Sequence, residues 1–258
     1  MEDEKTILKE VFGESSESEA EESIVFSSLH DDGSHSTTDQ NPTWEPIHQI
    51  NGLWLCRNFL SSHQQSTLLS HIQNEGWFTE SSNNQAMRFG DLPSWAIQLS
   101  HSIREVVLFG DQISQSPNLG SCDEENGSTL LPSNLLWREP LFDQLIVNVY
   151  QPGEGICAHV DLMRFEDGIA IVSLESSCVM HFTQVRAVDA NEKGEKDQDM
   201  TSIPVYLTPG SLVLLWGDAR YLWKHEINRK PGFQMWEGQE LSQKRRTSIT
   251  LRMLCPSV

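Results

Sequence analysis

The 258-residue sequence has no apolar run long enough to cross a membrane. A membrane-spanning helix needs about 18 or more consecutive apolar residues, and no segment approaches that length. The opening residues, MEDEKTILKE, are acidic and contain no apolar core of the kind that a secretory signal has. We therefore expect neither a membrane span nor secretion, and no membrane partner.

Paired cysteines are missing as well. The five cysteines are scattered without a C-x-x-C pair, at Cys56, Cys122, Cys157, Cys178 and Cys255. An odd number without a repeated spacing is typical of reduced thiols inside a cell and not of a disulfide framework. The sequence therefore predicts a protein of the cytoplasm or the nucleus, and it contains no feature that distinguishes these compartments.

Basic residues are scarce, because 18 Lys and Arg stand against 37 Asp and Glu, a formal net charge of −19. Such a charge argues against general affinity for nucleic-acid phosphates. The charge is uneven, however: residues 1–40 hold 12 acidic and 2 basic residues, a net −10, which leaves −9 for the rest. The stretch 224–252 is locally basic. The net charge of the whole chain therefore conceals a strongly acidic N-terminal segment and a locally basic stretch near the C-terminus.

The N-terminal segment, residues 1–43, is rich in Ser, Glu and Asp and shows no lasting apolar period. Such a segment cannot bury enough apolar surface to offset the entropy that ordering costs. We predict a disordered acidic tail, which is either phosphorylated or simply solvating. One folded domain is predicted to follow over residues 44–258.

Two amphipathic helical patterns precede a series of short strands. The first helix is predicted to begin with a capping box of Ser62 and Gln65, and the second to span 93–109. After a Gly-, Ser- and Asn-rich loop at 111–133, turns separate the β-runs QLIVNVY, ICAHVD, GIAIVSL, SCVMHF, PVYL, SLVLLW and RTSITLRML. This order predicts an α+β fold, a double-stranded β-helix (jelly roll) backed by N-terminal helices.

One of these runs, ICAHVDLMRF, places His159 and Asp161 two positions apart. Side chains at i and i+2 of a strand point to the same face, and a buried carboxylate without a partner is costly. The partner is either a bound cation or the imidazole itself.

A second histidine is needed to complete a metal site. His225 follows a strand and a tight turn, and in a jelly roll it can return beside His159, whereas His181 belongs to another strand. Two imidazoles and one carboxylate with open positions form the facial triad of non-haem iron(II) oxygenases. The alternative is a His–Asp pair with an unrelated buried histidine.

The run RRTSITLR places four side chains on one face of a strand: Arg246, Ser248, Thr250 and Arg252. Two guanidiniums that face into a barrel repel each other unless an anion lies between them, and Arg suits bidentate carboxylate binding. A dicarboxylic ligand satisfies both; the alternative is a solvent-facing basic edge. Asn148 and Tyr150 share a face of another strand and supply an amide and a phenol for polar recognition.

These motifs carry a family resemblance. NVYQPGEGICAHVD, the distant HEI and RRTSITLR resemble the AlkB family of iron(II)/2-oxoglutarate dioxygenases, with N-x-Y-x-x-G before H-x-D, a distal His and R-x-x-x-x-x-R. Within that family, runs such as GDARYLWKHEI are similar to the AlkB-like domain of wobble-uridine tRNA methyltransferases. The resemblance implies Fe(II) as the metal, with 2-oxoglutarate and O2 as cosubstrates.

The resemblance also assigns roles. It implies that His159, Asp161 and His225 are the catalytic residues and hold the iron. The residues implied for 2-oxoglutarate are Asn148, Tyr150, Arg246, Ser248 and Arg252, with Arg252 nearer the keto acid.

Departures from the family pattern bear on the substrate. Met163 stands where base-repairing members carry an acidic residue, and Ser248 stands where they carry Asn. Both argue against simple repair of N-methylated bases. Trp77, Phe78 and the run MRFGDL, which contains Arg88, occupy the place of the family's nucleotide lid. Together with Met163 they are the predicted substrate contacts, although Trp77 and Phe78 suit a hydrophobic core equally well.

The resemblance therefore implies a monomeric dioxygenase that hydroxylates or oxidatively demethylates a modified base in RNA, with tRNA as the favoured partner. Five basic residues are predicted to form a local phosphate-binding rim or merely to solvate loops: Lys224, Arg229, Lys230, Lys244 and Arg245. One alternative is a hydroxylase or demethylase of protein side chains, because the acidic average suits nucleic acid poorly. Another is a metal-bearing module that binds a partner without turnover.

Overall fold

Two antiparallel sheets dominate the computed structural model, which describes residues 41–80, 83–114, 129–185 and 202–256. The larger sheet has the strand order β1-β2-β9-β6-β13-β4-β3. Its strands are β1 (Thr43–Pro46), β2 (Leu53–Arg57), β3 (Gln85–Phe89), β4 (Gln144–Tyr150), β6 (Ile169–Leu174), β9 (Leu212–Leu215) and β13 (Arg246–Arg252).

The smaller sheet has the order β5-β10-β7-β8, and a two-stranded hairpin lies outside both sheets. The strands are β5 (Ile156–His159), β7 (Cys178–Gln184), β8 (Ser202–Leu207) and β10 (Trp223–Ile227), and the hairpin is β11 (Met235–Trp236) with β12 (Gln239–Glu240). The seven predicted β-runs all form strands, whereas β1, β3, β10 and the hairpin of β11 and β12 were not predicted. The predicted tail ends where β1 begins, and its residues 1–40 lie outside the described residues.

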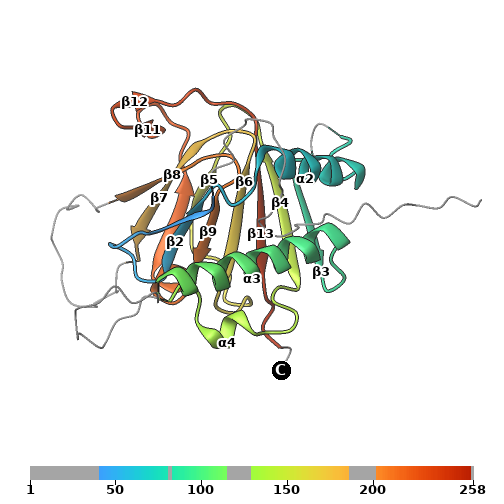
Figure 1. Cartoon of the computed structure of the whole chain (residues 1–258). Coiled ribbons are helices and arrows are strands. Elements are labelled where there is room, and N and C mark those ends of the chain that lie inside the picture. The colour runs from blue at the N-terminus through green and yellow to red at the C-terminus, as the bar shows by residue number, and fades with distance from the viewer. Residues whose placement is uncertain (1–40, 81–82, 115–128, 186–201, 257–258) are drawn as a thin grey trace, which may run out of the picture. The chain divides into compact units, whose positions relative to one another are not determined.

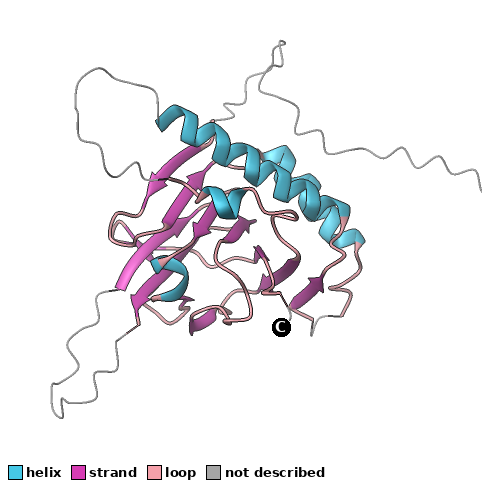
Figure 2. Ribbon diagram, turned by 90° about the horizontal axis from the view of Figure 1, so that it is seen from below, coloured by secondary structure: helices cyan, strands magenta, loops and turns pink. Residues whose placement is uncertain are grey.

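Two longer helices, α2 (Ser62–Asn74) and α3 (Ser94–Ser114), lie along one face of the seven-stranded sheet (Figures 1 and 2). Leu68 and Ile72 of α2 and Leu99 and Ile103 of α3 are buried, which gives each helix an apolar stripe at the spacing expected for packing on a sheet. Two short helices, α4 (Ser133–Leu136) and α5 (Asp218–Tyr221), lie in connections. The predicted α+β jelly roll backed by helices is therefore confirmed.

The predicted start of α2 is wrong by one residue. Ser61, and not Ser62, is the N-cap: the Gln64 amide donates to Ser61 Oγ (3.3 Å), and the Ser61 amide donates to Gln64 Oε1 (2.8 Å). The sequence SSHQQ contains two overlapping capping boxes. Gln65 takes no part in the capping box, and its Nε2 instead donates to the Leu60 carbonyl at 3.0 Å.

The helix α3 runs five residues beyond the predicted end at 109, into the predicted loop. Packing explains the extension. Trp44 Nε1 of β1 donates to the Val106 carbonyl (3.2 Å), and a Cβ at Gly110 would lie 2.5 Å from both Trp44 and Leu130. Contacts with segments far away in the sequence thus allow α3 to continue past Gly110, although glycine has a poor helix propensity.

The space between the two sheets has two halves of different character. In the apolar half, β2, β6 and β9 pack against β7 and β8 through side chains that include Leu53, Leu55, Ile169, Phe182, Val205, Leu207, Val213 and Leu215. In the cavity half, β4 and β13 face β5 and β10 across a cavity of about 200 Å³. Ile171, Met180 and Ile227 belong to both and form the boundary.

Two expectations about compartment can be compared with the described residues. Within them, no helix is both long enough and apolar enough to span a membrane. Cys56, Cys157, Cys178 and Cys255 are free thiols, as predicted, and Cys122 lies outside the described part of the chain.

Candidate active site

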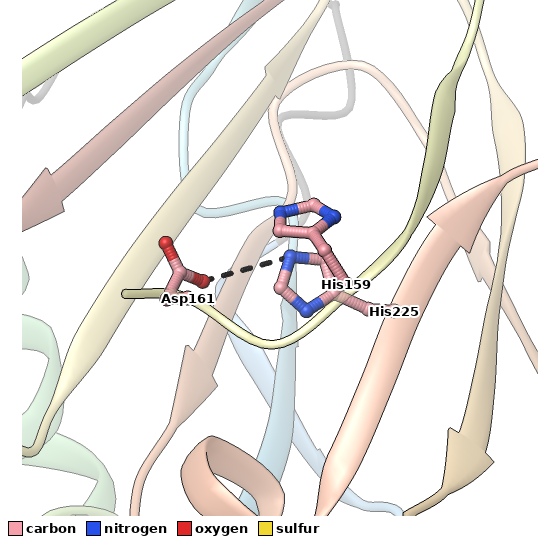
Figure 3. Close-up of side chains that lie close together, drawn as sticks. All are labelled: His159, Asp161 and His225. Carbon is pink, nitrogen blue, oxygen red and sulfur yellow. Dashed lines mark ion pairs between the residues drawn. The ribbon is translucent and has the colours of Figure 1, made fainter. Parts of the chain in front are cut away.

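Three potential metal ligands converge in the cavity half. His159 ends β5, Asp161 follows two residues later, and His225 lies on β10 directly opposite His159 in the antiparallel register. One ligand atom from each lies within 4.8 Å of the others, and the two imidazole centroids are 4.4 Å apart. Figure 3 shows the Asp161 carboxylate and both rings directed toward one point. The structure therefore brings together the three predicted ligands.

Burial and charge set the protonation of this cluster. Burial raises the pKa of Asp161, but His225, Arg252 and His159 outweigh it, and the net result is a pKa below the ordinary value. Burial lowers the pKa of His225 to about 4, against the opposing effect of Asp161, whose Oδ2 lies 3.7 Å from Nε2. At neutral pH the carboxylate is charged and the imidazole is neutral, the states in which both bind a divalent cation.

The backbone also orients His159. Its Nδ1 lies 2.8 Å from the Cys157 carbonyl, and a proton on Nδ1 makes this contact a hydrogen bond. The lone pair of Nε2 is then left for a metal. A hydrogen bond from the second ring nitrogen is the usual way in which proteins fix the tautomer of a metal-binding histidine.

Arg252 lies beside the potential ligands. Its Nη1 donates to Asp161 Oδ1, its Nε donates to Gln144 Oε1 at 2.7 Å, and its guanidinium lies 4.0 Å from the Phe165 ring centroid. Burial lowers the pKa of Arg252, and the Asp161 carboxylate opposes that effect. Arg252 thus orients Asp161 and carries positive charge at the metal end of the cavity.

Arg246 occupies the other end of the same strand face, and its side chain is 1% exposed. Its Nε donates to Ser173 Oγ at 3.0 Å, whereas Nη1 and Nη2 have no hydrogen-bond partner among the described residues. A buried guanidinium with two unpaired nitrogens is costly unless an anion binds it. The planar pair of nitrogens suits a carboxylate.

The register of β4 with β13 aligns the remaining predicted cosubstrate residues. Tyr150 is paired with Arg246 and Asn148 with Ser248, and paired residues share a sheet face. All four line the cavity. Gln85 of β3 lines it as well and donates Nε2 to Asn148 Oδ1 at 2.6 Å, a contact that the sequence did not indicate because β3 itself was not predicted.

The four predicted substrate residues are absent from the cavity lining among the described residues. Trp77 packs against Trp95 (6.2 Å between centroids) and lies under the Arg88 guanidinium at 4.4 Å. Phe78 lines a separate groove beside α2. Met163 is 71% exposed in the loop that follows Asp161.

Strand parity explains the position of Arg88. On β3, Gln85, Met87 and Phe89 are paired with cavity-side residues of β4, so Arg88 must point to the opposite face. Met87 and Phe89 are 42% and 46% exposed. The Arg164 guanidinium lies 5.6 Å from the Phe89 ring centroid. Met87, Phe89, Met163 and Arg164, together with the exposed Leu162, are here called the mouth surface.

His181 and the basic residues occupy other positions. His181 is paired with Glu226 on β10, and its ring packs edge-on against Phe233 at 6.0 Å, which places it outside the metal cluster. Four residues of the predicted phosphate rim are exposed, Lys224, Lys230, Lys244 and Arg245, and Arg245 pairs with Glu175. The Arg229 guanidinium differs from these, because Nε and Nη2 are buried.

A residue without a predicted role, Arg220 of α5, holds the loop that carries Asp161. It is 2% exposed and donates to the carbonyls of Asp161 (3.0 Å), Leu162 (2.8 Å) and Phe165 (3.1 Å). This contact ties the H-x-D segment to the helix that leads into His225. The one feature of the sequence that could have indicated this role is the short distance between Arg220 and His225.

Comparisons with known proteins agree with this geometry. A sequence profile of the 2OG-Fe(II) oxygenase superfamily matches residues 52–252. The chain belongs to that superfamily. It is 30% identical over 227 residues to the "Alkylated DNA repair protein ALKBH8 homolog" of Arabidopsis thaliana, which covers 79% of this chain and 58% of the relative. The predicted resemblance to AlkB dioxygenases is thereby confirmed.

Two further similarities concern a longer relative and the fold. The chain is 29% identical over 192 residues to the "tRNA (carboxymethyluridine(34)-5-O)-methyltransferase alkbh8" of Xenopus tropicalis, covering 73% of this chain and 27% of the relative. The chain thus spans little more than half of one relative and about a quarter of the other. The solved structure of OsALKBH1 superposes with a TM-score of 0.54 at 16% identity, over 82% of this chain and all of that chain.

Proposed function

We propose that this protein is an iron(II)- and 2-oxoglutarate-dependent dioxygenase that hydroxylates or oxidatively demethylates a modified base in RNA, with tRNA as the favoured substrate. The observation that carries the proposal is one cavity that contains His159, Asp161 and His225 at one end and the buried, unpaired guanidinium of Arg246 at the other.

The residues present suit both groups that the family implies. Two imidazole nitrogens and one carboxylate are the donor set of non-haem iron(II) sites. The unpaired nitrogens of Arg246 suit the distal carboxylate of 2-oxoglutarate, and Arg252, which contacts Asp161, supplies charge near the keto acid. The structure thus supports Arg246 for the distal end and Arg252 for the metal end.

When bound, iron and 2-oxoglutarate would activate O2, which is the oxidant for attack on a carbon–hydrogen bond. The side chains of the protein position these groups and form the surroundings in which they react. Arg252, which Gln144 holds in place, orients the Asp161 carboxylate. Asn148 and Tyr150 offer polar contacts along the cavity, and Ile171 contributes an apolar wall. Fixed dipoles and charges in such a site act without the cost of reorganising solvent.

The mouth surface supports a base as the substrate. The exposed ring of Phe89 on β3 and the Arg164 guanidinium in the loop after Asp161 lie 5.6 Å apart, and their neighbours in sequence Met87, Leu162 and Met163 are exposed apolar side chains. Rings and guanidinium planes stack on unpaired bases. The relative named as a tRNA methyltransferase supports RNA, but the methyltransferase activity in that name does not carry over, because only a quarter of that protein is covered.

A succinate-release assay with and without total tRNA tests the proposal. We expect basal release with iron and 2-oxoglutarate, stimulation by tRNA, and a changed nucleoside in the tRNA by mass spectrometry. Methylated single-stranded DNA is the matched comparison substrate. Demethylation of the DNA without change in any tRNA nucleoside would contradict the RNA proposal.

The formal charge of −19 favours a second candidate, a hydroxylase of protein side chains, because a strongly acidic protein repels nucleic-acid phosphates. Stimulation of succinate release by a protein extract after nuclease treatment, with no stimulation by tRNA, is the result expected for that candidate.

A further inference from the structure

Within the described residues, the Arg220 guanidinium donates hydrogen bonds to one loop alone, the loop that follows Asp161. Its Nη1 donates to the Asp161 carbonyl at 3.0 Å, and its Nη2 donates to the carbonyls of Leu162 (2.8 Å) and Phe165 (3.1 Å). Arg220 is 2% exposed, yet no carboxylate of the described chain forms an ion pair with it. A buried charge without a counter-ion is costly, and side chains that violate a local rule of stability are expected at functional sites.

The helix α5, which carries Arg220, is fixed to the same connection. The Gly217 amide at the N-cap of α5 donates to both carboxylate oxygens of Asp167, at 2.9 and 3.1 Å. A second amide of α5 donates to the Asn51 carbonyl at 2.9 Å. Arg220 therefore reaches the loop from a fixed support, and the strand β10 with the potential ligand His225 follows that support in sequence.

The other side of the loop contacts the segment after β13. The Cys255 amide donates to the Arg164 carbonyl at 2.8 Å. The backbone of the loop is thus held from two directions, whereas the side chains of Leu162 and Met163 are exposed. Three residues of the mouth surface therefore stand on a fixed backbone that also carries Asp161.

We propose that Arg220 is a positioning residue that holds Asp161 and the mouth residues 162–164 as one unit. The inference rests on the proposed function and adds to it a fixed spacing between the metal and the substrate surface. Metal ligands need to be held within about 0.5 Å of their productive geometry, and a substrate misplaced by about 1 Å reacts about 100-fold more slowly. A single guanidinium that contacts the loop at Asp161 and at Phe165 meets both needs.

Two measurements on the full-length protein test the inference. The first is the affinity for Mn(II), used in place of Fe(II), and the second is hydrogen exchange of the amides of residues 162–165. Arg220→Met, which fills the space without a hydrogen-bond donor, should weaken Mn(II) binding about 10- to 100-fold, the usual effect of removing a group that orients a metal ligand. It should also speed the exchange about 10-fold or more, because the carbonyls lose their donors.

Arg220→Lys keeps the charge but loses the planar fork, so it should give intermediate values in both measurements. Such partial rescue by the conservative variant is not expected of a side chain that only fills space. Should Arg220→Met not fold, Arg220→Lys supplies the same comparison with its own control.

The matched controls are Arg138→Met and Arg138→Lys. Like Arg220, Arg138 has a buried Nε without a partner among the described residues, and it donates to the carbonyls of Asp167 (2.9 Å) and Leu141 (3.4 Å). It also pairs with Glu166. Arg138 therefore holds the same connection beyond residues 161–165. Its variants should lower the melting temperature but keep the Mn(II) affinity and the exchange of residues 162–165 at wild-type values.

Three results would overturn the inference. Unchanged Mn(II) affinity and exchange in the Arg220 variants would show that the loop keeps its position without the guanidinium. Equal losses in the Arg220 and Arg138 variants would show a structural effect that is not specific to the ligand loop. Failure of the wild type itself to bind Mn(II) would remove the proposed function along with the inference, whereas the first two results leave that function intact.

Discussion

The apolar half and the cavity half of the space between the sheets are built from neighbouring strands and are almost equally buried. Leu207 and Phe182 in the apolar half are 0% exposed, and Arg246 and His225 in the cavity half are 1% and 6% exposed. The difference lies in the chemistry of the inward-facing side chains. In one half each side chain contacts other hydrocarbon; in the other, several polar groups face a cavity.

This contrast separates stability from binding. Burial of hydrocarbon stabilises the fold by about 25 cal/mol per Å², whereas a buried guanidinium without an anion lowers stability. Strand β6 shows both within one element, because Ile169 and Ile171 pack in the apolar core and Ser173 accepts from Arg246. We therefore expect substitutions in the apolar half to unfold the protein and substitutions in the cavity half to remove ligands from a folded protein.

The largest effect is expected from the metal ligands. His225→Ala should abolish metal binding and turnover, because two ligands cannot hold the metal that three hold. Metal content after dialysis and succinate release provide the measurement. His181→Ala is the control and should retain both; loss of metal in that variant with retention in His225→Ala would show that the site has been misassigned.

Substitutions of the two arginines of β13 should have different effects on metal and 2-oxoglutarate affinity. Arg246→Gln should weaken 2-oxoglutarate by about 2–5 kcal/mol, as expected when one partner of a buried ion pair is removed, and leave metal affinity unchanged. Arg252→Gln should weaken both, because Arg252 contacts Asp161. Titration calorimetry with Mn(II) and then 2-oxoglutarate separates the two effects. Unchanged 2-oxoglutarate affinity in Arg246→Gln would refute its assignment.

In the apolar half, Leu207→Ala should lower the free energy of unfolding by about 2–5 kcal/mol, the range for a leucine removed from a packed core. At temperatures well below the transition, 2-oxoglutarate affinity should be that of the wild type. Urea denaturation and calorimetry measure the two quantities. A large loss of 2-oxoglutarate affinity in the folded variant would contradict the conclusion that the apolar half serves stability and the cavity half serves binding.

Acid should destabilise the metal-free protein through His225. In the unfolded chain this group takes up a proton near its ordinary pKa of 6.5, but in the folded protein only near about 4. The unfolded state therefore binds more protons between those values, and stability falls as the pH falls through that window, by about 3 kcal/mol. Denaturation of the chelator-treated protein at pH 7 and pH 4.5 should show the loss, and His225→Gln should remove most of it.

The smallest effect is expected outside both halves. Deleting residues 1–40 should leave the melting temperature and basal turnover nearly unchanged, because that composition has little apolar surface to bury. RNA binding should become stronger, since a net charge of −10 is removed. A large fall in melting temperature would show that the segment packs on the folded domain.

The sequence by itself determined which side chains share a face. The spacing of two in H-x-D and in the alternating run from Arg246 to Arg252 directs side chains to one side of a strand wherever that strand is placed. For that reason the inward face of β13 could be predicted without a structure. The convergence of the candidate ligands His159 and Asp161 was predicted in the same way, although β5 ends at His159 and Asp161 lies in the loop that follows. The two longer helices and seven of the strands followed from local periodicity in the same way, whereas α4 and α5 were not predicted.

Only the tertiary structure decided which faces meet. The position of His225 directly opposite His159, the unpaired nitrogens of Arg246 and the opposite orientation of Arg88 all depend on the register of strands distant in sequence. Register is set by the packing of whole sheets and by the turns that connect the strands. No local pattern contains that information, because the interacting residues are brought together only when the long-range contacts form.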